Sequence, residues 1–326
     1  MENNLTGIQK HRLINKTTLV IVAKLIIAAG LLIYLINSVE YNQIISAINE
    51  ANLILIGLVM ILGILNIYLQ YSKWRITCNE VLGVKNNSKV FRSLFYGFSA
   101  GIITPLRIGE YFGRGIEFRD KSLVQVTVAT LIDKFFPLLM VASIGSVSSL
   151  LFIYYYHNVS IYIVLSLFVL IFSFFYLLIM LLVSNRFWNS LLFSRLNTSE
   201  RVRPFLDKLR VFENLDKKYF FKMILISFLF YSCFLIQYAL LVIAFSNHYD
   251  FIHYLWAANL IMFTKTIIPP ISFGELGIRE GASVYFLSQM GETASVGFNS
   301  SILLFIINLL IPALIGVGMF LRKNDN

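Results

Sequence analysis

One short motif occurs twice in this chain, 165 residues apart, and it constrains the fold more than any other feature. The copies at 102–114 and 267–279 share the pattern Ile-Ile-x-Pro-x-x-x-Gly-Glu-x-x-x-Arg. Each copy places a proline, a glycine and a Glu–Arg pair inside strongly apolar sequence. Ionised side chains are costly at membrane depth and are retained there for function. We therefore expect both copies to form part of a functional site.

The surrounding composition is that of a membrane protein. Of 326 residues, 58% are hydrophobic and only 13% are charged, and the mean hydropathy is +0.75. Soluble domains carry about 25% charged residues. Several apolar runs reach the roughly 20 residues that a helix needs to cross a bilayer. The sequence predicts an all-α polytopic membrane protein, with residues 1–326 as a single integral membrane domain in the cell (inner or plasma) membrane.

The net charge of +10 would suggest nucleic acid as a partner of a soluble protein. Here the basic residues cluster beside apolar segments, which favours cytoplasmic loops facing anionic lipid, with no nucleic-acid partner. The stretch 186–222 holds nine Lys and Arg against four Asp and Glu, so we expect a cytoplasmic basic loop at 186–218. Both termini carry basic residues next to apolar runs and are expected in the cytoplasm.

Six spanning helices are expected from the apolar runs. Residues 40–51 form an additional amphipathic segment that is too short to span and is expected on the outer surface. The expected spans are 17–37, 52–74, 122–155, 160–184, 219–245 and 297–321.

The two motifs are expected at the tips of re-entrant helical hairpins. Proline ends a helix and glycine permits a sharp turn, so each motif breaks the helix that contains it. The segment 90–103 before the first motif is short for a crossing, and basic residues flank both ends of the hairpin. The first hairpin should therefore enter and leave on the cytoplasmic side, and the second on the outer side. The structural residues of these hairpins are Pro105, Gly109, Pro269, Pro270, Gly274 and Gly277.

This alternation predicts an inverted-topology repeat. Residues 52–155 contain two spans around the first hairpin, and residues 219–321 contain two spans around the second. Inverted repeats whose broken helices meet near the bilayer midplane are a recurring architecture of secondary transporters.

The ionisable residues within these apolar segments are the candidate substrate-binding residues. The pairs Glu110–Arg114 and Glu275–Arg279 have i,i+4 spacing with the acid first, which is the favourable order on a helix. Mutual neutralisation within each pair is the plain alternative, but the other cations favour an anionic headgroup beside the half-helix N-termini. The complete set is Arg107, Glu110, Arg114, Asp133, Lys134, Lys265, Glu275, Arg279 and Glu280.

Asp133 leaves two interpretations open. It is either an ion-pair partner of Lys134 or of a hairpin arginine, or a carboxylate that couples transport to proton movement. The nearby Pro137 is expected to kink the span that carries it.

Both motifs resemble those of the flippase-like family that is built on the transmembrane region of bacterial lysylphosphatidylglycerol synthases. The resemblance covers nearly the whole chain. Two departures are present: Glu275 replaces a common glycine, and only Asp133 remains of a Glu-Arg-x-x-Asp motif usual in the family. The motifs that carry the resemblance are Thr104-Pro105-x-Arg107-x-Gly109-Glu110 with Arg114, and Pro269-Pro270-x-Ser272-x-Gly274-Glu275-x-Gly277-Ile278-Arg279-Glu280.

The resemblance implies a membrane protein that moves or presents a lipid-linked substrate in cell-envelope synthesis. We predict a lipid translocase that binds an anionic headgroup between the two hairpins, with an anionic phospholipid or polyprenyl phosphate as its partner. The alternative is a scaffold that transports nothing and assists a glycosyltransferase or another envelope enzyme.

We expect no enzymatic activity, cofactor or metal. An intramembrane enzyme using Glu110 or Asp133 as a base would lack a nucleophile or a metal set, since the four histidines are scattered. The two cysteines form no disulfide framework. Lysylphosphatidylglycerol synthases carry a soluble aminoacyl-transfer domain after the membrane region, whereas this sequence ends five residues beyond its last expected span. Aminoacyl transfer by this chain is therefore not expected.

Overall fold

The computed structural model describes residues 41–183, 217–268 and 277–324, and all regular elements in these ranges are helical. Four helical segments are long and apolar enough to cross a membrane: Leu53–Leu82, Leu123–His157, Lys217–Ser246 and Ala294–Arg322. They correspond to four of the six expected spans. Of the other two, 17–37 lies outside the described residues, and 160–184 corresponds to the apolar helix α7 (Ile161–Val183).

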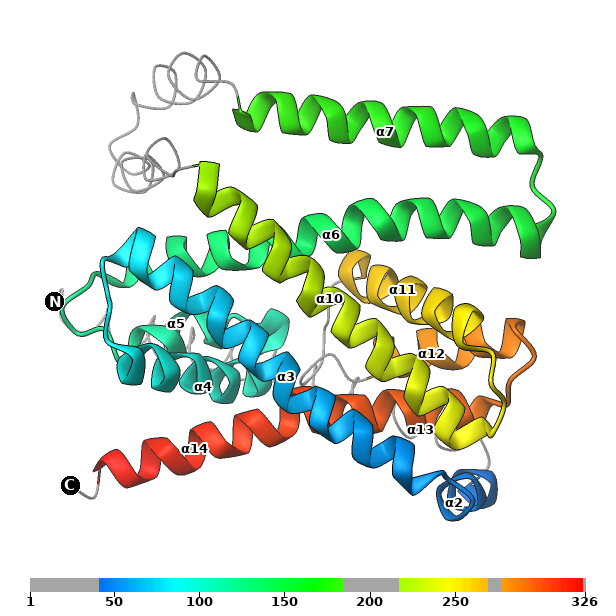
Figure 1. Cartoon of the computed structure of the whole chain (residues 1–326), viewed down its shortest axis with the longest axis horizontal. Helices are drawn as coiled ribbons and strands as arrows, with labels where there is room; N and C mark the ends of the chain where they lie inside the picture. Colours follow the sequence, from blue (N-terminus) through cyan, green and yellow to red (C-terminus); the bar gives the residue numbers. More distant parts are fainter. Residues whose placement is uncertain (1–40, 184–216, 269–276, 325–326) are drawn as a thin grey trace, which may run out of the picture.

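Two long helices run side by side in opposite directions through the middle of the molecule (Figure 1). These are α3 (Leu53–Thr77) and α10 (Lys217–Ser246). The Asn52 side chain accepts hydrogen bonds from the Ile54 and Leu55 amides and so caps the start of α3. Asn is one of the residues preferred at a helix N-cap. The Asn52 amide donates to the Ala244 carbonyl at 2.8 Å, which ties the start of α3 to the end of α10.

The span of α3 is longer than the sequence indicated. The expected end was near Trp74, but the helix continues through a π-helical turn at Cys78–Leu82. Cys78, beyond the expected end of the span, is fully buried in this turn. Lys73, which lies near the end of the expected span, is also buried.

The first motif lies in a helical hairpin formed by α4 (Asn87–Ile103) and α5 (Gly109–Gly115), which are joined by a short 3-10 turn at Pro105–Arg107. The chain reverses through Leu106 and Arg107, which have φ values of 55° and 54°. Gly109, expected to provide the sharp turn, is not among the residues with positive φ. Gly109 is instead the first residue of α5, and its amide donates a 2.6 Å hydrogen bond to Thr104 Oγ1.

Gly109 and Gly113 are needed because α5 lies against the backbone of α4. A Cβ at Gly109 would lie 2.2 Å from the Ala100 carbonyl oxygen, and one at Gly113 would lie 2.4 Å from that of Tyr96. Small residues spaced four apart permit such close helix contacts in membranes. Gly109 was therefore correctly predicted to be needed in the hairpin, but it permits close helix packing and does not turn the chain.

The second hairpin consists of α11 (Phe251–Ile267) and α12 (Ile278–Gln289). Its tip at 269–276 lies outside the described residues, and with it Pro269, Pro270, Gly274 and Glu275. Gly277 is described, and its φ of 94° is in the region that favours glycine. Its amide donates a 2.6 Å hydrogen bond to Glu280 Oε2 at the start of α12.

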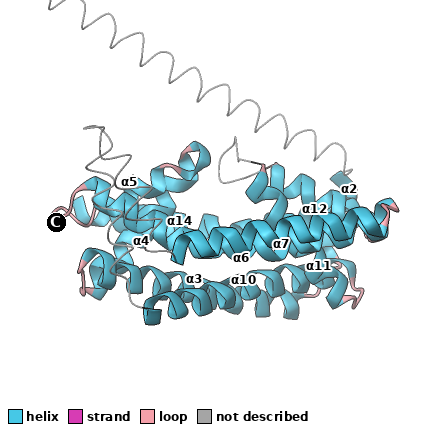
Figure 2. Cartoon of the chain, turned by 90° about the horizontal axis from the view of Figure 1, so that it is seen from above, coloured by secondary structure: helices cyan, strands magenta, loops and turns pink. Residues whose placement is uncertain are grey.

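The two hairpins occupy equivalent places in the bundle. The other long helices are α6 (Leu123–His157) and α13 (Ala294–Phe305), which continues through a π-helical turn at Ile306–Leu310 into α14 (Ile311–Asn324). In the first hairpin α4 packs on α14 and α5 on α6; in the second α11 packs on α6 and α12 on α13. The hairpins open toward opposite ends of the bundle, with their inner ends near its middle (Figures 1 and 2).

The remaining described helices lie at the edge. The helix expected at 40–51 is α2 (Tyr41–Asn49), which contacts α13 and α10. Helix α7 runs back along α6 (Figure 1).

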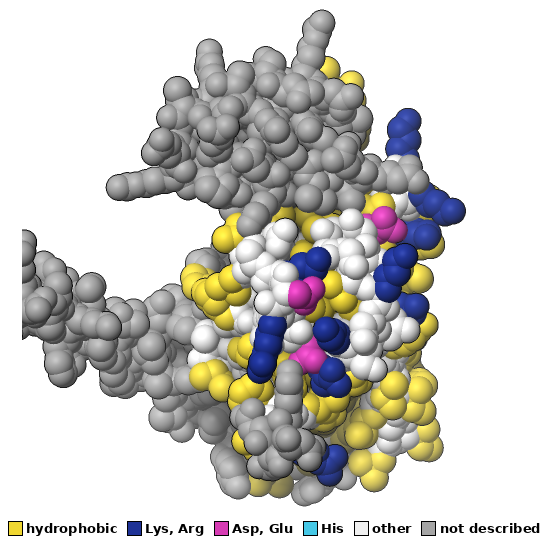
Figure 3. Space-filling view, turned by 90° about the vertical axis from the view of Figure 1, so that its left-hand side faces the viewer, with side chains coloured by type: hydrophobic (Ala, Val, Ile, Leu, Met, Phe, Trp, Pro, Cys, Tyr) yellow, Lys and Arg dark blue, Asp and Glu magenta, His cyan; other side chains and the backbone are white. Residues whose placement is uncertain are grey.

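The two ends of the bundle differ in charge. The basic end contains the loops 83–86 and 116–122, the start of α10 and the end of α14, and Lys and Arg side chains gather on it (Figure 3). The acidic end contains the loops 158–160, 247–250 and 290–293. These three loops carry Asp250 and Glu292 and contain no Lys or Arg.

Candidate functional site

A cavity of about 340 Å³ lies between the two hairpins, and all four long helical segments contribute to its wall. Seven of the nine predicted binding residues line it. Glu280 is fully buried and bonds to one of them, Arg279, whereas Glu275 lies outside the described residues. The seven lining residues are Arg107, Glu110, Arg114, Asp133, Lys134, Lys265 and Arg279.

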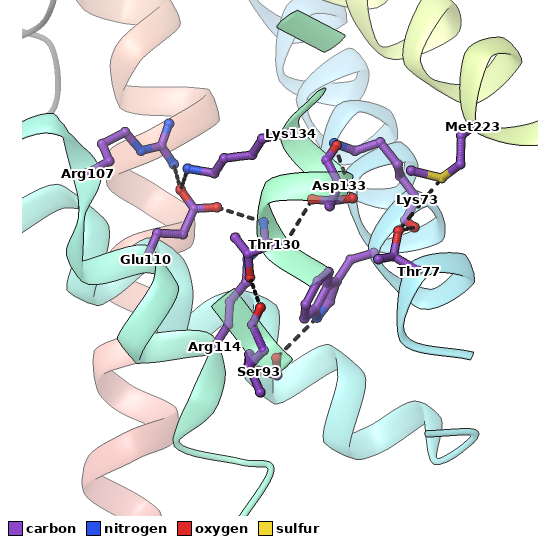
Figure 4. Close-up of polar contacts among 12 residues, drawn as sticks. Lys73, Thr77, Ser93, Arg107, Glu110, Arg114, Thr130, Asp133, Lys134 and Met223 are labelled. Atoms are coloured by element: carbon purple, nitrogen blue, oxygen red, sulfur yellow. Dashed lines mark hydrogen bonds and ion pairs between the residues drawn. The ribbon is translucent and has the colours of Figure 1, made fainter. Parts of the chain in front are cut away.

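Glu110 binds three cations in the wall of this cavity. Arg114 Nη2 and Lys134 Nζ each lie 2.7 Å from its carboxylate, and Arg107 Nη2 lies at 3.1 Å. Figure 4 shows Arg107 and Lys134 pointing toward the same carboxylate from the hairpin turn and from α6. The i,i+4 pairing of Glu110 with Arg114 is confirmed, but it is only part of a larger network.

Asp133 binds two cations on the other side of Arg114. Arg114 Nη1 lies 2.9 Å from Asp133 Oδ2, and Lys73 Nζ lies 3.3 Å from Asp133 Oδ1. Lys73 also donates a 2.7 Å hydrogen bond to the Asp133 carbonyl (Figure 4). Of the ion-pair partners expected for Asp133, the hairpin arginine is therefore observed, whereas Lys134 pairs with Glu110.

Lys73 is a site residue that the sequence interpretation missed. Its side chain is buried and lines the cavity. The available signal was its spacing from two other polar residues of the same apolar helix, Asn66 and Gln70. Positions separated by four and three residues share one helix face, so these three side chains form a polar stripe.

An aromatic ring lies against the side chain of Arg114. Its guanidinium lies 4.3 Å from the centre of the Trp74 ring, a geometry that favours a cation–π contact. Trp74 Nε1 in turn donates a 3.1 Å hydrogen bond to Ser93 Oγ on α4. Gly97 leaves room for this arrangement, because a Cβ there would lie 2.7 Å from Arg114 Cγ.

The second hairpin contributes Lys265 and Arg279. Arg279 bonds to Glu280 and donates a 3.0 Å hydrogen bond from Nε to Ser301 Oγ. Its guanidinium lies 5.2 Å from the Phe305 ring centre, and Lys265 Nζ lies 5.7 Å from that of Phe234. Among the described residues, Arg279 therefore forms its ion pair with its sequence neighbour Glu280.

Cations outnumber carboxylates in the described wall of this cavity. The wall contains six cationic side chains and two carboxylates, which is an excess of four cations. If Glu280, which pairs with Arg279 behind the wall, is also counted, the excess is three. Such a site favours a bound anion, because an anion offsets the repulsion among cations that are poorly solvated by water. The six cations are Lys73, Arg107, Arg114, Lys134, Lys265 and Arg279.

Comparison with known proteins identifies the family of this chain. No curated protein and no solved structure matches the chain significantly. A family profile described as "Lysylphosphatidylglycerol synthase TM region" matches residues 21–316, which include both motifs and every residue that lines the cavity. The chain therefore belongs to the family of the lysylphosphatidylglycerol synthase transmembrane region.

Proposed function

We propose that this protein is a lipid translocase of the cell envelope that binds an anionic headgroup in the cavity between its hairpins. The observation that carries this proposal is the excess of cations over carboxylates, to which both hairpins contribute. A phosphate is the natural anion for this set, because Arg and Lys recognise it through charge-assisted hydrogen bonds. The family supports a role in lipid or envelope chemistry. The proposal assigns no catalytic residue and no cofactor.

The proposed orientation places the basic end in the cytoplasm and the acidic end outside. Cytoplasmic loops are enriched in Lys and Arg, and the charges of the described loops differ in this direction. In this orientation the first hairpin is re-entrant from the cytoplasm and the second from the outside, and both termini are cytoplasmic. Residues 52–155 and 219–321 then form the two inverted repeats.

This arrangement suggests how a headgroup would cross. Each hairpin approaches the cavity from one side of the membrane, so displacement of either one would open the cavity to that side alone. Alternating access in inverted-repeat transporters follows the same principle. The headgroup would exchange between cations of the first hairpin, such as Arg107, and those of the second, Lys265 and Arg279.

A reconstitution experiment tests the proposal. Purified protein is placed in liposomes that contain either fluorescent phosphatidylglycerol or fluorescent phosphatidylcholine, and an impermeant quencher reports the fraction exposed outside. We expect the protein to accelerate exchange of the anionic lipid only. The variant Arg107→Gln/Lys265→Gln should lose this acceleration, whereas Lys85→Gln/Lys89→Gln, at exposed positions of the basic end, should retain it.

The same experiment can reject the translocase. Equal exchange of both lipids by wild type and by the cavity variant would contradict a selective anion site. Failure to accelerate either lipid would instead favour the alternative role, a scaffold for a glycosyltransferase or another envelope enzyme.

A further inference from the structure

Helix α6 is attached to the first hairpin by one half and to the second hairpin by the other. In the half nearer the basic end, Asp133 and Lys134 form ion pairs with residues of α5. The other half packs on α11. The contact there is so close that a Cβ at Gly145 would lie 2.5 Å from Cδ2 of Phe263 on α11. Each half of α6 is therefore fixed to a different hairpin.

The continuous helix α13–α14 is divided in the same way. Helix α13 packs on α12, and a Cβ at Gly297 would lie 3.0 Å from the Ser283 carbonyl oxygen. Helix α14 packs on α4, and a Cβ at Gly316 would lie 2.3 Å from the Phe95 carbonyl oxygen. Figure 1 shows α13 beside the second hairpin and α14 beside the first. This helix therefore also joins the two hairpins.

Both helices have an interrupted hydrogen-bond ladder between their halves. In α6 the interruption is Pro137, which has no amide hydrogen and cannot donate to the Asp133 carbonyl one turn earlier. Lys73 Nζ donates to that carbonyl at 2.7 Å instead (Figure 4). In α13–α14 the interruption is the π-helical turn Ile306–Leu310, with Pro312 two residues after it. Prolines and π-helical turns are the usual sites at which long helices bend.

The two interruptions lie at the level of the cavity. Pro137 lines the cavity, as do Asn308 and Leu309 of the π-helical turn. The packing on either side of this level defines two bodies. The first body comprises α4, α5, residues 123–136 of α6, and α14. The second body comprises α11, α12, α13 and residues 138–157 of α6. Bending at the interruptions would tilt one body relative to the other and change the shape of the cavity between them.

We propose that Pro137 and the segment 306–312 are paired hinges about which the first and second bodies move relative to each other. Each hairpin moves as a unit, because its glycine contacts with the neighbouring backbone leave no space for deformation within a body. The change is then concentrated at a few residues, as in other hinged proteins. The motion is inferred from packing alone, whereas its role in lipid exchange rests on the proposed function.

Distances between spin labels test the hinges without any lipid substrate. Val124→Cys and Tyr155→Cys place labels at exposed positions on either side of Pro137. At 1.5 Å per residue, these positions are about 46 Å apart in a straight helix. Ala294→Cys and Leu321→Cys flank the second hinge in the same way. We expect double electron–electron resonance to give a broad distribution of distances for both pairs in lipid nanodiscs.

A pair within the first body is the matched control for these distances. Lys89→Cys on α4 and Leu321→Cys on α14 lie at exposed positions near the basic end. We expect one narrow distance for this pair, because α4 and α14 move together. All labelled proteins carry Cys78→Ala and Cys233→Ala, since both native cysteines are buried. A control distribution as broad as those of the hinge pairs would overturn the assignment of α14 to the first body.

Replacement of Pro137 tests what the hinge does. Pro137→Ala restores an amide donor and favours a regular helix, so it should narrow the Val124–Tyr155 distribution. It should also slow exchange of phosphatidylglycerol in liposomes at least tenfold, while the affinity for this lipid in a thermal-shift titration stays within threefold of wild type. Pro137→Gly keeps the helix easy to bend and should exchange lipid within threefold of the wild-type rate.

Gly318→Ala is the matched control for stiffening a helix. It strengthens α14 away from both hinges, and its Cβ would meet nothing within 4 Å. It should leave the distance distributions and the exchange rate unchanged. Exchange slowed as much by Gly318→Ala as by Pro137→Ala would overturn the specific role of Pro137.

The outcomes separate the hinges from the proposed function. A single narrow distance for both hinge pairs in a wild-type protein that exchanges lipid would overturn the hinges and leave the translocase standing. Wild-type exchange by Pro137→Ala, with its distance distribution narrowed, would overturn the role of this hinge in transport. Broad distributions in a wild-type protein that exchanges no lipid would support the motion and overturn the translocase.

Discussion

Arg114 and Asp133 connect the first hairpin to α6 through a 2.9 Å ion pair, although both side chains are almost completely buried. Each also has a second partner of opposite charge: Glu110 for Arg114 and Lys73 for Asp133. The charges therefore form one continuous row that runs from the hairpin turn through α5 and α6 to α3. A change at one position should affect both the stability of the hairpin and the charge of the cavity.

Replacement of Arg279 by methionine should strongly destabilise the protein. It leaves the fully buried Glu280 without its cation, and breaking a buried ion pair costs about 3–5 kcal/mol. Thermal unfolding in detergent should show the loss, and Arg279→Met/Glu280→Gln should recover part of it. Arg75→Ala, at an exposed position of α3, should have little effect. Unchanged stability of Arg279→Met would show that Glu280 does not depend on this pairing.

Replacement of Gly113 by alanine should loosen the first hairpin. The added Cβ would lie 2.4 Å from the Tyr96 carbonyl oxygen, so α4 and α5 would have to separate. Gly281→Ala is the control, because its Cβ meets nothing within 4 Å and alanine favours a helix by about 1 kcal/mol. Thermal stability should fall for Gly113→Ala and stay level or rise for Gly281→Ala. Equal effects of the two changes would contradict close packing as the role of Gly113.

The sequence predicted those parts of the fold that depend on local pattern. Apolar length identified the four long segments, and i,i+4 spacing identified the Glu110–Arg114 pair. Spacing in the sequence could not predict which residues of other helices pair with these charges. Asp133 meets Arg114 and Lys73 because of how α3, α5 and α6 pack, and no sequence spacing encodes that packing.

Lys73 and Gly109 show two further limits of local reasoning. The expected span ended at residue 74, but the helix extends through a π-helical turn and Lys73 is buried. Gly109 was expected to turn the chain, whereas the turn uses Leu106 and Arg107 and the glycine permits close packing. Pattern identifies where a glycine is needed, but only the fold shows whether its backbone freedom or its small size is used.

The orientation of the hairpins is testable by cysteine labelling. Arg119→Cys follows the first hairpin and Gln289→Cys ends the second, and both positions are exposed. The background carries Cys78→Ala and Cys233→Ala, since both native cysteines are buried. In intact cells an impermeant thiol reagent should label Cys at position 289 from outside, and position 119 only after permeabilisation. Labelling of both positions from one side would contradict the inverted repeat.

An anionic lipid should stabilise the folded protein more than a zwitterionic lipid of the same chain length. Phosphate binding relieves repulsion among the cavity cations, and a ligand that saturates the native state at one hundred times its Kd adds about 2.7 kcal/mol. Arg107→Gln/Lys265→Gln should abolish the difference in thermal stability while the unliganded protein remains folded. Lys85→Gln/Lys89→Gln should keep it. A cavity variant that retains the difference would place the anion elsewhere.

Asp133→Asn should change stability and anion binding in opposite directions. The substitution keeps the shape of the side chain but removes the charge that faces both Arg114 and Lys73. Loss of a buried ion-pair partner should destabilise the unliganded protein by about 3–5 kcal/mol. The excess of cations in the cavity also rises by one, so a bound anion offsets more repulsion than in wild type.

Titration of Asp133→Asn with phosphatidylglycerol should therefore give a larger rise in thermal stability than wild type shows, from a lower starting point. Glu80→Gln removes the same charge at an exposed position and should alter neither quantity. A rise equal to or smaller than that of wild type would mean that the anion does not meet Arg114 and Lys73. If Asp133 instead couples proton movement, lipid exchange by Asp133→Asn in liposomes should lose its dependence on a pH gradient. An ion-pairing role predicts the same response to the gradient in both proteins, because the carboxylate then remains charged throughout transport.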